Sequence, residues 1–250
     1  MSGEDVSNLS DLERIQVTPQ SKKLLTHNGR AIEGLFNYKI RSNLHDEYTD
    51  LGSLTYDIPS NTGLNIVLNV RDKEGLVIPL AGSTLTISDG IPTVVMLQRV
   101  KAFTKQLPSE EENRDSLIKV IAHYFPVTHP YKDLLQGDNR LDWEMELLKE
   151  VENLAKNKGF NEIRLKSGFQ NPYITNSYPL AMSVQQYDLV AERMGGWIPI
   201  TTDGTEIVGP DRMLLGKIIR DLRSKKLRTE DDIKSAYPEA KLPAHWSKKL

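Results

Sequence analysis

Residues 141–155 carry apolar side chains at helical spacing, and this is the clearest pattern in the chain. The apolar face consists of Leu147, Leu148, Val151, Leu154 and Ala155. Gly159 follows and predicts the end of the helix, because glycine readily takes the left-handed conformation found there. Ile163 and Leu165 then alternate with charged residues, which predicts a short strand.

A second helix is predicted from about Pro179 to Met194, where Gly195 and Gly196 end it. The apolar run 197–200 after it predicts another strand. A helix between two strands favours a parallel crossover in a sheet with helices packed on it.

The first half of the chain is rich in strand patterns. Phe36, Tyr38 and Ile40 share one face of a predicted strand, and Leu64 to Val70 alternate in the same way. Shorter strands are predicted at 76–80 and 84–87, and an almost entirely apolar one at 93–100, which suits a central position. Tight turns between these segments favour an antiparallel meander.

After residue 200, Asp203-Gly204 predicts a hairpin turn. A helix is expected from Pro210 to Leu222 and a short one from Thr229. Pro238 and Pro243 are expected to bracket a loop that precedes His245 and Trp246.

The predicted fold class is therefore α/β (α+β), with a mixed, mostly antiparallel sheet and a helix–strand–helix crossover. The expected organisation is an N-terminal arm over residues 1–30, an α/β domain over 31–208 and a helical extension over 209–250.

Composition excludes several kinds of chemistry. The chain has 250 residues and no cysteine, so disulfides, thiolate nucleophiles and thiolate metal sites are impossible. The net charge of −2 gives no global attraction to nucleic acid or anionic membrane. Neither a long apolar run nor a basic, apolar leader is present, so a cytoplasmic location without membrane association is expected.

Common catalytic motifs are also missing from the sequence. No two of the five histidines have zinc-ligand spacing, and no metal is expected. The Gly-x-Ser-x-Gly elbow, the Gly-x-Gly-x-x-Gly loop and the Walker pattern are absent.

Two helix ends resemble a known enzyme family. The passage Ala155-Lys-Asn-Lys-Gly159-Phe160 and the passage Ala191-Glu-Arg-Met-Gly195-Gly-Trp197 resemble helix-to-strand passages of GCN5-related N-acetyltransferases. The order of elements, with antiparallel strands before helix–strand–helix–strand–strand, is similar too. The resemblance covers about Leu141 to Val208.

The resemblance implies acetyl-CoA as cofactor and an amine as acceptor. It places the pyrophosphate at a helix N-terminus, where this chain has Gln136, Gly137, Asn139 and Arg140 as candidate cofactor-binding residues. This loop departs from the family in holding one glycine and two aspartates. The family's frequent catalytic tyrosine is replaced by Ala191.

Tyr187 lies about one turn before Ala191 and is the candidate proton donor, with helix packing as the alternative role. The segment 167–178 follows a strand end, where α/β folds bind ligands. Its Asn171, Tyr173 and Asn176 are candidate substrate-binding residues, and a surface connection is the alternative.

Three functions follow as hypotheses. The first is an acetyltransferase. The second is a protein of the same fold without catalytic activity, which binds or assembles with a protein partner and can be of viral origin. The third is a nucleic-acid-binding module that uses the basic residues 220–228 with Lys234 and Lys241. For that cluster, the alternative is a solvated helix end.

Overall fold

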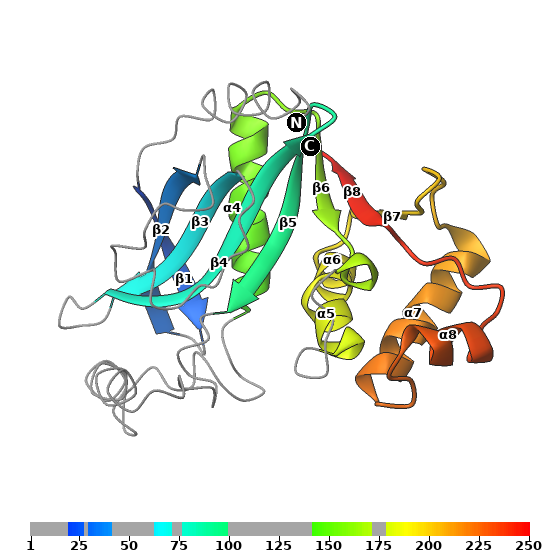
Figure 1. The fold of residues 1–250 in the computed structure, drawn as a ribbon. Helices are drawn as coiled ribbons and strands as arrows, with labels where there is room; N and C mark the ends of the chain where they lie inside the picture. The colour runs from blue at the N-terminus through cyan, green and yellow to red at the C-terminus, as the bar shows by residue number, and fades with distance from the viewer. Residues whose placement is uncertain (1–19, 28–29, 42–62, 72–76, 100–141, 172–178) are drawn as a thin grey trace. The chain divides into compact units, whose positions relative to one another are not determined.

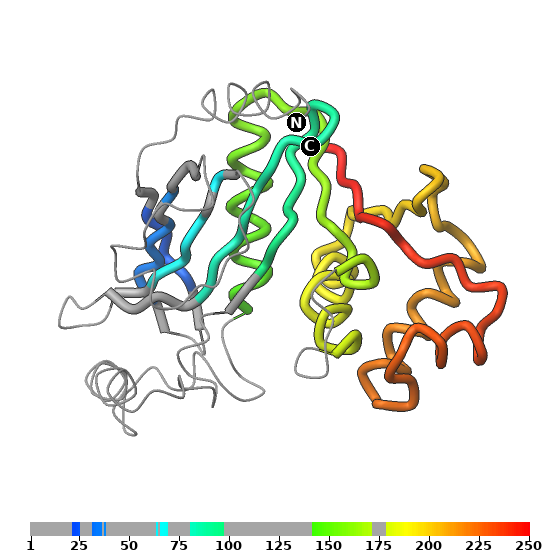
Figure 2. The backbone as a smooth tube through the Cα atoms, viewed as in Figure 1, coloured from blue at the N-terminus to red at the C-terminus, as the bar shows by residue number. Residues whose placement is uncertain are grey.

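The computed structural model describes residues 20–27, 30–41, 63–71, 77–99, 142–171 and 179–250 (Figures 1 and 2). The chain divides into two compact units. One comprises Met1–Asp11, Thr84–Leu97 and Glu144–Leu250, and the other comprises Leu12–Ser83 and Gln98–Trp143. None of the described helices is long and apolar enough to cross a membrane.

The described strands belong to one mixed sheet in the order β1-β2-β3-β4-β5-β6-β8-β7. The β5–β6 pair is parallel, whereas β1–β2, β2–β3, β6–β8 and β7–β8 are antiparallel. The predicted class, α+β with a mixed and mostly antiparallel sheet, is confirmed.

The unit of Leu12–Ser83 and Gln98–Trp143 contains β1 (Gln20–His27), β2 (Arg30–Arg41), β3 (Gly63–Arg71) and the first part of β4 (Val77–Ser88). Leu64, Ile66 and Leu68 are buried, as their alternation predicted. β4 is one strand where two were expected. The small residues at 81–83 are all buried, and they continue the strand between its two apolar parts.

Strand β1 was not predicted, because residues 1–30 were expected to form an arm. Leu24 is exposed and Leu25 is buried, so the apolar pair gives no clear alternation in the sequence. The strand forms through backbone pairing along its whole length with β2, from Gln20 opposite Asn37 to His27 opposite Arg30.

The unit that holds Glu144–Leu250 is built on the predicted crossover. β5 (Ile91–Arg99) and β6 (Glu162–Lys166) are parallel, and α4 (Trp143–Asn157) lies between them in sequence. The five residues predicted for the apolar face of α4 are all buried. Gly159 has a φ of 81°, which explains why glycine ends this helix.

The second predicted helix is two helices, α5 (Leu180–Gln186) and α6 (Asp188–Met194), which meet at Tyr187. Before them, η3 (Gly168–Gln170) is a short 3-10 turn. After them, β7 (Ile198–Ile200) forms as predicted, and the turn at Asp203-Gly204 leads to a single bridge between Ile200 and Glu206.

The C-terminal helices also form as predicted: α7 (Gly209–Arg223) and α8 (Glu230–Ala236), with Thr229 in a capping box. After the expected loop comes a strand for which no prediction was made, β8 (His245–Lys249), which lies between β6 and β7. The sequence His-Trp-Ser-Lys-Lys lacks apolar alternation, so this strand could not be recognised from its pattern.

Gly168 permits a close approach between η3 and α5. A Cβ atom there would lie 2.5 Å from the carbonyl carbon of Ser183 and 2.6 Å from the nitrogen of Val184. Because these are backbone atoms, they cannot rotate away as a side chain would.

We expect Gly168→Ala to lower the free energy of unfolding by about 1–3 kcal/mol, as overpacking does. Gly216→Ala in α7 is the matched control, because its Cβ would meet only side-chain atoms, the nearest at 3.5 Å. That change is expected to stabilise the protein by about 0.5–1 kcal/mol through helix propensity. Urea unfolding of both variants measures this, and equal effects would contradict the close packing at Gly168.

Candidate functional site

Tyr187 lies at the junction of α5 and α6 and is 5% exposed. Its hydroxyl oxygen accepts a hydrogen bond from the Leu97 backbone nitrogen at 3.0 Å and lies 3.4 Å from the Leu97 carbonyl oxygen, to which it donates. The side chain of Gln186 also donates to that carbonyl. Two neighbouring side chains thus bind the backbone near the end of β5.

These contacts give the Leu97 backbone partners near the end of β5. The register of β5 and β6 pairs Thr93 with Arg164 and Val94 with Leu165. Beyond these pairs the two strands diverge (Figure 1). Backbone groups on a strand need partners when buried, and for Leu97 those partners are helix side chains instead of a neighbouring strand.

The other predicted site residues are only partly described. Asn171 follows η3, and its amide donates to the Ser183 hydroxyl at 3.0 Å, so it helps to fasten η3 to α5. Ser183 in turn donates to the Gly168 carbonyl at 3.0 Å. Outside the described residues lie the remaining candidates Gln136, Gly137, Asn139, Arg140, Tyr173 and Asn176.

A buried carboxylate lies next to Tyr187 in sequence. Asp188 is fully buried, and its Oδ1 accepts hydrogen bonds from the Ser167 hydroxyl and the Trp246 indole, each at 2.6 Å. Its Oδ2 accepts from the Gly168 nitrogen at 2.8 Å. One side chain therefore joins the end of β6, η3, α6 and β8.

Burial raises the pKa of Asp188 from 3.8 to about 6, although its three donors oppose the shift. The backbone and indole N–H groups can only donate, so they fit the ionised carboxylate. The Ser167 hydroxyl can also accept, and it offers a partner for the protonated form.

Arg212 of α7 packs on the ring of Trp246, one of the three residues that donate hydrogen bonds to Asp188. Its guanidinium lies 4.3 Å from the centre of the Trp246 ring and 3.9 Å from the Glu192 carboxylate. Its Nη1 atom is buried without a hydrogen-bond partner within the described part of the chain. Burial lowers the pKa of Arg212, against the nearby charges of Glu192 and Asp188.

Sequence reasoning singled out Tyr187 as a candidate, and it did not single out its neighbours Gln186 and Asp188 or the distant Trp246. The available signal for Asp188 was an acidic residue inside an otherwise apolar helix face, with Val184 and Ala191 nearby at helical spacing. Its donors come from positions 20 and 58 residues away, and no local pattern indicates such contacts.

Within the described ranges, no group of three or more His, Asp or Glu side chains lies close enough together to hold a metal ion. No protein-family model matches the chain, and comparisons with curated proteins and with solved structures give no significant match.

The raised pKa of Asp188 predicts a characteristic pH dependence. Between pH 4 and 6 the folded protein binds more protons at Asp188 than the unfolded chain does, so this carboxylate makes the free energy of unfolding fall as pH rises. The shift of about two pKa units corresponds to at most about 3 kcal/mol. In Asp188→Asn this contribution is absent. The amide nitrogen of Asn would replace Oδ2, so two hydrogen-bond donors, the amide N–H and the Gly168 N–H, would face each other.

We expect Asp188→Asn to be less stable than the wild type at pH 4, and the gap to narrow towards pH 7, as measured by urea unfolding across that range. Asp203→Asn is the control. Hydrogen bonds from Thr201 and Thr205 lower the pKa of the exposed Asp203, so its removal costs more at high pH than at low pH. A stability gap for Asp188→Asn that is the same at every pH would contradict this account.

Proposed function

We propose that the chain is an acyltransferase that moves an acetyl group from acetyl-CoA to an amine, with the reaction at the carboxyl end of β5. The observation that carries this proposal is the hydrogen bond between the Leu97 nitrogen and the Tyr187 hydroxyl oxygen. It brings a candidate acid to the place where two parallel strands separate.

The position of this bond supports the proposal. In sheets with parallel crossovers, ligands bind beyond the carboxyl ends of the strands, where neighbouring strands part. The β5–α4–β6 crossover has such a point after Val94 and Leu165 (Figure 1). The resemblance of the passages ending at Gly159 and Gly195 to the acetyltransferase family points to the same reaction.

The chemistry needs three groups. The amine nitrogen attacks the thioester carbonyl carbon, a C–N bond forms, and the C–S bond breaks. A base takes the amine proton, backbone N–H groups of the strand stabilise the oxyanion, and an acid protonates the departing thiolate. Tyr187 is the proposed acid, with the cofactor at Gln136, Gly137, Asn139 and Arg140, and the acceptor near Asn171, Tyr173 and Asn176.

The two bonds of Tyr187 differ in a way that suits an acid. The bond that its oxygen accepts from the Leu97 nitrogen is of ordinary length at 3.0 Å, and it fixes the oxygen. The bond that its hydroxyl donates to the Leu97 carbonyl is long at 3.4 Å and therefore weak. Gln186 also serves that carbonyl, so the hydroxyl proton can turn away without leaving the carbonyl unpaired.

Tyr187→Phe tests this role. We expect acetyl-CoA to raise the thermal unfolding temperature of the wild type and of the variant alike. Acetyl transfer to a panel of primary amines is expected to fall by about 10²- to 10⁴-fold in kcat, the usual contribution of a general acid. Thiol release measures it cleanly, because the chain has no cysteine of its own.

Tyr237→Phe is the matched control. Its hydroxyl donates to Asp221 at 2.5 Å, so this substitution also removes a strong hydrogen bond. That bond joins the end of α8 to α7 and does not involve β5. We expect its kcat to equal that of the wild type. If millimolar acetyl-CoA gives the wild type no thermal shift, the acyltransferase proposal is wrong, and a non-catalytic binding protein becomes the leading function. If the shift occurs but both variants keep full activity, Tyr187 serves packing alone.

A further inference from the structure

Positive charge is concentrated in one short segment. Residues 209–228 contain seven Lys and Arg residues and two Asp residues, a net charge of +5 in a chain whose total is −2. The remaining residues therefore carry −7. Such an asymmetry indicates a local electrostatic function that the total charge conceals.

The acidic residues of this segment are already engaged. Asp211 pairs with Lys241 at 2.9 Å, and Asp221 accepts from Tyr237 and lies 3.6 Å from Lys226. Most of the seven Lys and Arg side chains, in contrast, are not engaged in ion pairs of this kind within the described part of the chain. Six of the seven are exposed, and four of these six are called the α7 basic surface below: Lys217, Arg220, Arg223 and Lys225.

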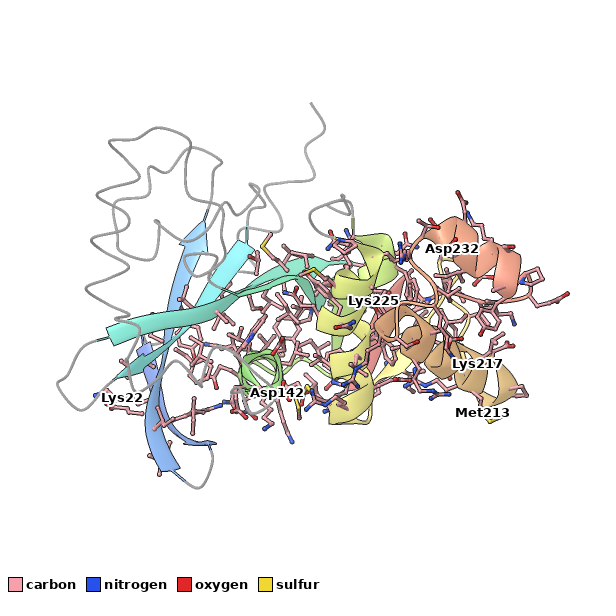
Figure 3. The ribbon with its side chains drawn as sticks, turned by 90° about the horizontal axis from the view of Figure 1, so that it is seen from below. Lys22, Asp142, Met213, Lys217, Lys225 and Asp232 are labelled. Atoms are coloured by element: carbon pink, nitrogen blue, oxygen red, sulfur yellow. The ribbon has the colours of Figure 1, made fainter. Side chains whose placement is uncertain are left out.

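Within the part of the chain that the structure describes, Arg220, Arg223 and Lys225 make no ion pair. Lys217 lies 5.1 Å from the centre of the Tyr237 ring. Figure 3 shows Lys217 beside Met213 on one side of α7 and Lys225 at the other end of the helix. The charges therefore extend along α7 and past its last turn.

Lys225 stands in a conformation that its side chain disfavours. It has a φ of 61°, and its nitrogen bonds to the Leu222 carbonyl while that of Lys226 bonds to Asp221, the pattern of a helix ending that usually takes glycine. The helix dipole explains cations in the last turn, but glycine would occupy position 225 without strain. A strained lysine suggests that its charge is used.

We propose that the α7 basic surface binds the phosphate backbone of nucleic acid without sequence specificity. A lipid surface fits less well. The apolar stripe of α7 is buried in the protein, through Leu215, Ile218, Ile219 and Leu222, which leaves Met213 as the exposed large apolar side chain of the helix. The surface has no exposed aromatic ring for stacking on bases, so phosphate contacts must supply the affinity.

The first test is Lys225→Gly. Glycine removes the strain, so we expect urea unfolding to show a stabilised protein. It also removes one charge, so we expect weaker binding of a fluorescently labelled 20-nucleotide RNA and of the matching DNA duplex. A gain in stability with no loss of binding would mean that Lys225 only ends the helix, and it would overturn its role.

The second test is the salt dependence of duplex binding. Four phosphate contacts predict a slope of about −3 to −4 in log K against log salt concentration, and Arg220→Gln with Arg223→Gln should bring it about two units closer to zero. The control is Lys149→Gln with Lys156→Gln on α4, which removes the same charge from other exposed positions. It is expected to keep the wild-type slope.

Three outcomes would overturn the proposal. One is no binding of either nucleic acid at low salt. Another is an equal loss of affinity in the Arg and Lys double variants, which would mean that only net charge matters. The third is binding to phosphatidylserine vesicles or to an acidic polypeptide but not to nucleic acid, which would assign the surface to a different partner. All three are independent of the acetyl-CoA experiment.

Discussion

The unit that contains the candidate site depends on one buried carboxylate. Asp188 is fully buried, and its two oxygens accept three hydrogen bonds, from Ser167, Gly168 and Trp246. A buried charge without such partners would cost several kcal/mol, so each donor must be in place when the chain folds. The requirement fixes β6, η3, α6 and β8 relative to one another.

Local patterns predicted the elements whose stability is local. The apolar face of α4, the helix end at Gly159 and the helix start at Thr229 are each encoded in a few neighbouring residues, and all were confirmed. Strands β1 and β8 were missed for the opposite reason. Their side chains do not alternate, and they exist because a partner strand supplies the backbone hydrogen bonds. The break between α5 and α6 at Tyr187 was missed because nothing in its immediate sequence ends a helix.

The same distinction separates the parts of the candidate site. Tyr187 was proposed because it lies about one helical turn before Ala191, which occupies the position of the family tyrosine, and the structure adds its contact with Leu97, which lies 90 residues earlier. Gln186 carries no local signature of its role, and the acidic residue at 188 in an apolar helix face does not reveal which distant segments it binds. Their types are ordinary for a helix, and only the fold reveals what they bind. A sequence therefore indicates which side chains are available for chemistry, whereas long-range pairing decides which of them meet.

The buried carboxylate also connects the two proposed functions physically. Trp246 donates to Asp188 through its indole nitrogen, and Arg212 of α7 lies over the face of the same ring. Helix α7, which carries the basic surface, is thereby packed against the hydrogen-bond network of Asp188, the residue next to Tyr187. A nucleic acid bound to α7 would contact an element anchored to the proposed reaction centre, and not a freely moving tail. Arg212 presents its charge to the ring and to Glu192, whereas Arg220 and Arg223 of the same helix are exposed.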